Sequence, residues 1–172
     1  MAITKVASEI KIGAAEALWA TVTLGHTEEG QTARLTKTLA ERKVDQYGDS
    51  LVDQVLVGMQ VEVTLNIAQW IYDTLLIAYP EATKGTGDYI HAGGEPGQLM
   101  STESEELILR PYGATGSTED TVIKKAYVRE VGDISYTNDG DRLVAVTFEG
   151  LLDTTKGNGA MLWALYAPEA GA

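Results

Sequence analysis

Residues 51–80 read LVDQVLVGMQVEVTLNIAQWIYDTLLIAYP, and this stretch decides the fold. Between residues 59 and 67 apolar and polar side chains alternate with a period of two, which predicts a half-buried strand. Its two faces carry Met59, Val61, Val63, Leu65 and Ile67 on one side and Gln60, Glu62, Thr64 and Asn66 on the other. Over residues 68–79 the apolar period becomes that of a helical face. Pro80 ends the helix because its ring and missing N–H do not allow another turn. The sequence therefore predicts a strand with one apolar and one polar face that runs into an apolar helix.

The chain before this stretch predicts two more strands. Residues 18–24 (LWATVTL) form the first, which ends at Gly25, and the alternating residues 31–39 form the second. Residues 1–17 show little periodicity and are expected to be a flexible arm. Residues 40–58 are mostly polar around a Tyr47-Gly48 turn signal, and we expect a loop here. Such a loop either contacts a partner or covers its own core.

The last third of the chain predicts a β-hairpin. Residues 121–136 and 142–152 have strand composition, and the Asp-Gly within residues 138–141 supplies the positive φ angles of a tight turn. In the second strand Val144, Val146 and Phe148 alternate with a polar set that includes Glu149. The tail, about residues 154–172, contains one apolar run that fits a closing strand or a docking segment. The fold class predicted is mainly β with one flanking helix, a β-sandwich or barrel of minor α+β character, in a single domain over residues 1–172.

Composition excludes several classes of protein. The net charge of -12 counts against a nucleic-acid-binding surface, which needs clustered Lys and Arg. Zero cysteines exclude disulfides, thiol chemistry and cysteine-based zinc sites. The sequence has no apolar run of about 18 residues that could span a bilayer and no apolar h-region of a secretory signal. A soluble protein made in a reducing cytoplasm is the simplest expectation.

The search for catalytic motifs finds none, so we expect no enzyme, no cofactor and no metal. G-x-S-x-G, G-x-x-x-x-G-K-[ST] and H-E-x-x-H are all missing from the sequence. His26 and His91 fall in predicted loops, and residues 138–141 lack the ligand spacing of a calcium loop. Glu62 and Glu149 could form an acid/base pair only with a substrate pocket beside them, and the sequence indicates no such pocket.

The order of these parts resembles the major tail tube proteins of long-tailed, siphophage-like bacteriophages. The resemblance spans about residues 19–153 and rests on four stretches: LWATVTLG, VDQYGDSLVDQVLVG, MQVEVTLNI leading into the helix, and the late hairpin around NDGD. It implies a structural virion protein whose hexameric rings stack into a hollow tail tube. In such a tube a shared β-barrel forms the inner wall, and DNA passes through it during ejection.

Carried onto this chain, the resemblance places residues 59–67 in the wall and residues 43–58 in a ring-stacking loop, with the helix outside. The lumen-facing side chains would be Gln60, Glu62, Thr64, Asn66 and Glu149. The stacking residues would be Asp45, Gln46, Tyr47, Gly48, Asp49 and Asp53. Implied partners are further copies of the chain, the tape measure, tail tip and terminator proteins, and DNA that transits without specific binding. The protein would be made in the host bacterial cytoplasm and reside in the virion tail.

A different class of protein also fits the pattern. A β-sandwich on a virion or cell surface could recognise carbohydrate, and it would have the same alternating strands. Rings or filaments favour the tube, whereas a monomer that binds a sugar at high protein concentration favours the binding module.

Overall fold

The computed structural model describes residues 15–25, 27–43, 51–69, 71–84, 90–91, 93–94, 96–112, 119–134, 142–155 and 162–165. The described residues are mainly β with a single helix, as the sequence predicts. The strands and the helix are β1 (Ala15–Trp19), β2 (Val22–Thr23), β3 (Thr27–Lys43), β4 (Leu51–Ile67), α1 (Tyr72–Ala78), β5 (Thr83–Lys84), β6 (Ile90–His91), β7 (Glu105–Pro111), β8 (Thr121–Ile134), β9 (Val144–Gly150) and β10 (Ala164–Leu165). No helix in these ranges is long and apolar enough to cross a membrane.

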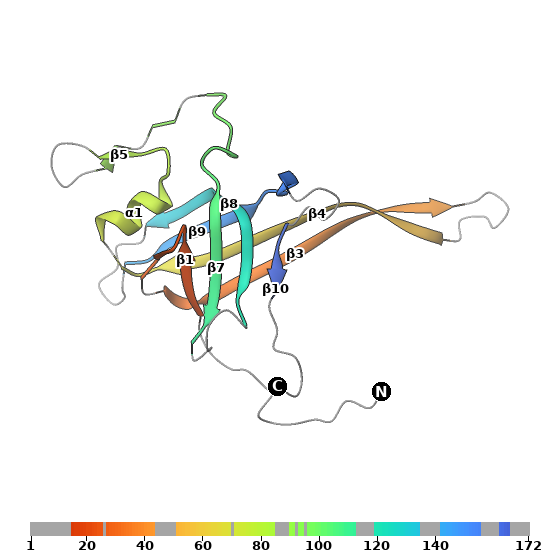
Figure 1. The fold of residues 1–172 in the computed structure, drawn as a ribbon, viewed down its shortest axis with the longest axis horizontal. Coiled ribbons are helices and arrows are strands. Elements are labelled where there is room, and N and C mark those ends of the chain that lie inside the picture. The colour runs from red at the N-terminus through yellow and green to blue at the C-terminus, as the bar shows by residue number, and fades with distance from the viewer. Residues whose placement is uncertain are drawn as a thin grey trace, which may run out of the picture.

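One antiparallel sheet of eight strands dominates the structure, in the order β2-β1-β7-β8-β9-β4-β3, with β10 paired to β8. The sheet curls, so that β1 and β7 cross over β3, β4 and β9 (Figure 1). The last strand, β3, approaches β1 near the other end of the sheet, where the Gln31 side-chain amide on β3 donates to the Ala15 carbonyl on β1 at 2.7 Å. The apolar run in the tail contributes β10, so at least this part of it is a closing strand. β5 and β6 pair antiparallel as a separate two-stranded sheet, so His91, which the sequence places in a loop, lies on β6.

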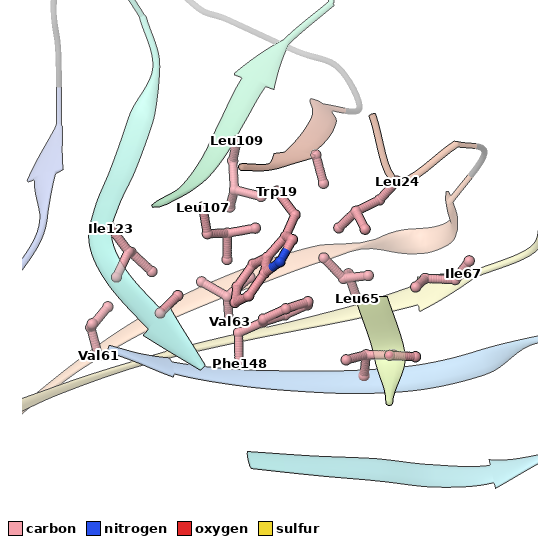
Figure 2. Packing of buried hydrophobic residues seen from close by; sticks show 14 of the residues in the cluster. Trp19, Leu24, Val61, Val63, Leu65, Ile67, Leu107, Leu109, Ile123 and Phe148 are labelled. Atoms are coloured by element: carbon pink, nitrogen blue, oxygen red, sulfur yellow. The ribbon is translucent and has the colours of Figure 1, made fainter. Parts of the chain in front are cut away.

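The core lies inside the curl. Trp19 of β1 and Phe148 of β9 come from opposite sides of it, with ring centroids 4.9 Å apart (Figure 2). The apolar set of β4 is buried as predicted from Val61 to Ile67. Met59 is an exception, because it is 45% exposed and lies beyond the last residue that pairs with β9. Its predicted place in the core is therefore wrong.

The helix is shorter than the periodicity predicts. It begins at Tyr72 rather than Ala68, because β4 stays paired to β3 and β9 as far as Ile67. The Gln69 side chain packs against Gly25, where an added Cβ would lie 1.9 Å from Oε1 of Gln69. The backbone of Gly25 also has a φ of +77°, which favours glycine. Thr74 and Ala78 of α1 are buried, and Leu75 and Ile77 pack against the core cluster.

The first predicted strand is a hairpin instead. β1 starts at Ala15, inside the predicted N-terminal arm, and a turn at Ala20 and Thr21 separates it from β2. Both turn residues have positive φ, 47° and 73°. Asn and Gly are the usual residues at such positions, so Ala-Thr carries no turn signal in the sequence.

The largest departure from prediction is a long hairpin that projects from the body. β3 and β4 are 17 residues each and pair from Thr27↔Ile67 out to Lys43↔Leu51 (Figure 1). Residues 40–43 and 51–58 are therefore strand rather than loop. The predicted turn at Tyr47-Gly48 lies outside the described residues. We call residues 36–43 and 51–60 of this hairpin the arm, which is a different segment from the predicted N-terminal arm of residues 1–17.

Candidate assembly interface

The predicted lumen residues share one face of the sheet. Pairing of β4 with β9 sets Glu62 opposite Glu149, Thr64 opposite Thr147 and Asn66 opposite Ala145. The neighbouring residues on β3 that pair with this polar set are Thr32, Arg34 and Thr36. Side chains of residues paired across antiparallel strands lie on the same face, so these groups form one continuous polar surface, which we call the polar face.

Glu149 is the centre of a hydrogen-bond network on the polar face. Its Oε2 accepts a hydrogen bond from the Tyr127 hydroxyl at 2.8 Å and lies 3.5 Å from Nη1 of Arg129. Its Oε1 accepts from the side-chain amide of Gln60. Burial, and then the hydrogen bond to Glu149, raise the pKa of Tyr127, because the phenolate would lie close to a carboxylate. Glu149 therefore links β4, β8 and β9 on this surface.

Two more ion pairs lie on β7 and β8. Lys124 Nζ is 2.6 Å from Oε1 of Glu106. Arg110 holds the carboxylate of Asp120, which is 1% exposed, by a fork that includes Nη2–Oδ2 at 2.7 Å. This hydrogen bond and the charge of Asp120 raise the pKa of Arg110. Cations on this part of the sheet are thus matched with carboxylates of the same chain.

The arm carries the most exposed apolar surface in the described part of the chain. Seven large apolar side chains on it are between 44% and 66% exposed: Leu39, Leu51, Val52, Val55, Leu56, Val57 and Met59. Leu39 pairs with Leu56 and Ala40 with Val55, and successive residues of a strand point to opposite faces. The arm therefore exposes apolar side chains on both of its faces, alongside charged ones such as Lys37 and Arg42. Exposed large apolar side chains gathered in one segment mark an interaction site.

The arm also has open backbone edges. β9 pairs with β4 only over Glu62–Ile67, so residues 51–61 have no strand partner on that side within the described ranges. The outer edge of the arm on β3 has none there either. Rows of unpaired N–H and C=O groups next to apolar side chains are a template for pairing with another chain.

The predicted stacking residues divide into two groups. Asp45, Gln46, Tyr47, Gly48 and Asp49 lie outside the described residues. Asp53 lies on β4 opposite Arg42, so its assignment to a loop is wrong. The strand continues there because Leu51, Val52, Val55, Leu56 and Val57 favour β structure despite Asp53 and Gln54.

Sequence reasoning missed the apolar arm itself, along with Tyr127 and Arg129 as partners of Glu149. The run LVDQVLV was a usable signal for the arm, but its bulge breaks the alternation. Thr38 pairs with Gly58 and Leu39 with Leu56, which leaves Val57 as an extra residue.

A small hollow lies beside the network of Glu149. It measures about 270 Å³ and is lined by Tyr127, Arg129, Glu103, Gln98, Glu81 and Met100, among others. No group of three or more Asp, Glu or His side chains within the described ranges is arranged to hold a metal ion.

No family model matches the sequence, and no curated protein sequence matches it. A chain in a solved structure described as "Virion of native gene transfer agent (GTA) particle" is similar, with 8% sequence identity and a TM-score of 0.46. The match covers 85% of this chain and 93% of that chain. A likeness at this level carries no argument about function.

Proposed function

We propose that this chain is a structural virion protein that assembles with copies of itself through the arm. In this proposal the assembled form is a stack of hexameric rings, the tail tube of a long-tailed bacteriophage, and the chain has no catalytic activity. The observation that carries the proposal is the arm, which exposes seven large apolar side chains on two faces and two open strand edges. Burying that surface between neighbouring copies removes apolar area from water and pairs the backbone groups.

The polar face would form the inner wall of the tube. Gln60, Glu62, Thr64, Asn66 and Glu149 lie on it together, and its arginine beside Glu149 is held in an ion pair. With Arg129 held by Glu149, and Arg34 placed opposite Glu62, the carboxylates of the same face compete with a DNA phosphate for both arginines, and a net charge of -12 adds repulsion. DNA would then pass through without binding. The tape measure, tail tip and terminator proteins would be the further partners in the virion.

The proposal is tested with one arm variant and one matched control. Val52→Glu places a charge on the arm, where Val52 is 52% exposed, and Val22→Glu places the same charge on β2, where Val22 is 49% exposed. We expect the unmodified protein and Val22→Glu to form rings or tubes in negative-stain electron microscopy and high-mass species by light scattering. We expect Val52→Glu to stay monomeric with an unchanged circular dichroism spectrum.

A protein that remains monomeric at every concentration reached, with or without the Val52 substitution, would contradict the proposal. Equal assembly of both glutamate variants would show that the arm is not the contact.

The second candidate function is a carbohydrate-binding module. The hollow of about 270 Å³ beside Tyr127 favours it, because an aromatic ring and polar groups such as Arg129 and Gln98 line that space. A monomer whose sugar binding is lost in Tyr127→Ala would support this candidate over the tube.

A further inference from the structure

A groove lies at the root of the arm, beside the open edge of β4. Its volume is about 400 Å³, and its apolar side chains are Leu56, Val57, Met59, Leu151, Leu152 and Leu162. Two glycines, Gly58 and Gly150, complete the lining, so no lining residue carries a charge. Leu152 is 52% exposed on this surface.

Gly150 lies where the wall of the groove meets the core. An added Cβ at this position would lie 2.3 Å from Cγ1 of Val61 and 3.0 Å from Cγ2 of Ile123, so the backbone passes directly against the core. From there the chain leaves β4, and the Leu151 N–H donates to the Lys125 carbonyl of β8 at 2.6 Å. The departing chain forms one wall, and the arm forms the other.

We propose that this groove receives the outer end of β4, around Leu51–Val55, from a second copy of the chain. The inference rests on the proposed function and names the surface on which the arm docks. The outer end of β4 has the matching chemistry, because Leu51, Val52 and Val55 are exposed and Asp53 is the one charged residue in that stretch. Leu and Val side chains fill an uncharged apolar groove without desolvating a charge.

The segment that fills the groove has to come from another copy of the chain. Leu51 to Leu56 are paired continuously with β3 apart from single bulges, so the ribbon cannot fold back on itself. At about 3.3 Å per residue, Val52 lies roughly 13 Å along β4 from the groove residue Leu56. The outer end of the arm therefore cannot reach the groove at its own root.

Charge also favours a second copy at this place. Two chains of net charge -12 repel each other over most of their surfaces. The groove is uncharged, and the arm balances Lys37, Arg42 and Lys43 against Glu41 and Asp53 over its described residues. Contact here brings together an uncharged groove and a segment of low net charge. A reciprocal exchange of arms would close a dimer, whereas a head-to-tail contact between arm and groove generates the rings or filaments that the proposed function requires.

Disulfide trapping tests the contact directly, because the chain has no cysteine of its own. One protein carries Val52→Cys on the arm and Leu152→Cys in the groove, both at positions that are 52% exposed. The matched control carries Val52→Cys and Val22→Cys. After mild oxidation of assembled protein, we expect a reducible ladder of covalent multimers from the first protein and at least tenfold less cross-linking from the control.

Each other result has a defined meaning. Assemblies that form without cross-links between positions 52 and 152 would overturn this inference and leave the proposed function standing. Cross-linking that stops at the dimer would overturn the head-to-tail arrangement. If no assemblies form, both the inference and the proposed function fail.

A second variant checks the groove without cysteine chemistry. Leu152→Glu puts a charge into the groove at a half-exposed position, so the monomer is expected to keep its fold and its melting temperature. We expect the variant to lose assembly and to regain it when mixed at low ratio with unmodified protein, because its own arm still docks. Assembly equal to that of the unmodified protein would count against the groove.

Discussion

Glu62 on β4 and Glu149 on β9 are direct cross-strand partners on the polar face. Two like charges in this relationship destabilise a sheet. Glu149 offsets that cost through Tyr127, Gln60 and Arg129, which contact its two oxygens. Arg34 is the β3 partner of Glu62 on the side away from β9. The pair is thus tolerated by the groups around it, and the two carboxylates contribute differently to stability.

The first prediction compares the amide variants of this pair. Glu149→Gln weakens two hydrogen bonds and an ion pair, and we expect it to lower the free energy of unfolding by about 1–2 kcal/mol. Glu62→Gln removes one of two repelling charges, and we expect a change within about 0.5 kcal/mol. Urea unfolding of the monomer at low salt measures both. Equal losses in the two variants would contradict the unequal roles of the carboxylates.

The second prediction concerns the pH dependence that Tyr127 contributes. Burial and the hydrogen bond to Glu149 raise its pKa above the ordinary 10.0. The folded state then holds the proton more tightly than the unfolded chain, so the stability from this group is complete below pH 10 and is lost as the pH rises through the raised pKa. Tyr127→Phe removes this contribution, so we expect its free energy of unfolding to fall less at alkaline pH than that of the unmodified protein. Unfolding of both proteins at increasing alkaline pH measures the difference.

Glu149→Gln provides the control for the cause of that shift. It removes a negative charge beside the phenol, so the pKa of Tyr127 falls, yet it stays above 10.0 because burial is the largest cause. Tyrosine-selective carbon NMR follows the titration, and the Tyr127→Phe spectrum assigns the signal. A pKa that does not fall in Glu149→Gln would contradict the hydrogen bond to Tyr127.

The third prediction uses two glycines on neighbouring strands. Gly150→Ala drives a Cβ into Val61 and Ile123, which are both buried, and we expect a loss of about 1–3 kcal/mol from overpacking. Gly58→Ala meets nothing within 4 Å, and we expect no loss or a gain of up to about 1 kcal/mol from the stiffer unfolded chain. Thermal unfolding of the monomers compares them. A loss at Gly58 as large as that at Gly150 would contradict the close approach at Gly150.

The elements that sequence reasoning predicted well are those with a clean period. Val61, Val63, Leu65 and Ile67 are buried as their alternation predicts, and so are Val144, Val146 and Phe148. The errors fall where the local signal is weak. The turn at Ala20–Thr21 lacks the residues that usually adopt positive φ, and the bulge at Val57 interrupts the alternation of the arm.

The candidate site was predictable in part. The alternation separates Gln60, Glu62, Thr64 and Asn66 from the apolar set, so a shared polar face follows from the sequence. Their assignment to a lumen stays a prediction. The partners of Glu149 did not follow, because Tyr127 and Arg129 come from β8 and their register against β9 contains a bulge. The sequence predicts a loop for residues 40–43 and 51–58 of the arm, because their exposed apolar residues belong to strands that no core covers within one chain.

The sequence by itself determined that this protein is mainly β, with a strand that has one apolar and one polar face and runs into a helix. Those properties depend on spacing along the chain, which a single strand or helix expresses locally. Only the tertiary structure decided that Glu62 faces Glu149, that the arm stands clear of the body and that a groove opens at its root. These depend on register and on where β9 ends against the core at Gly150, and residues far apart in sequence set both.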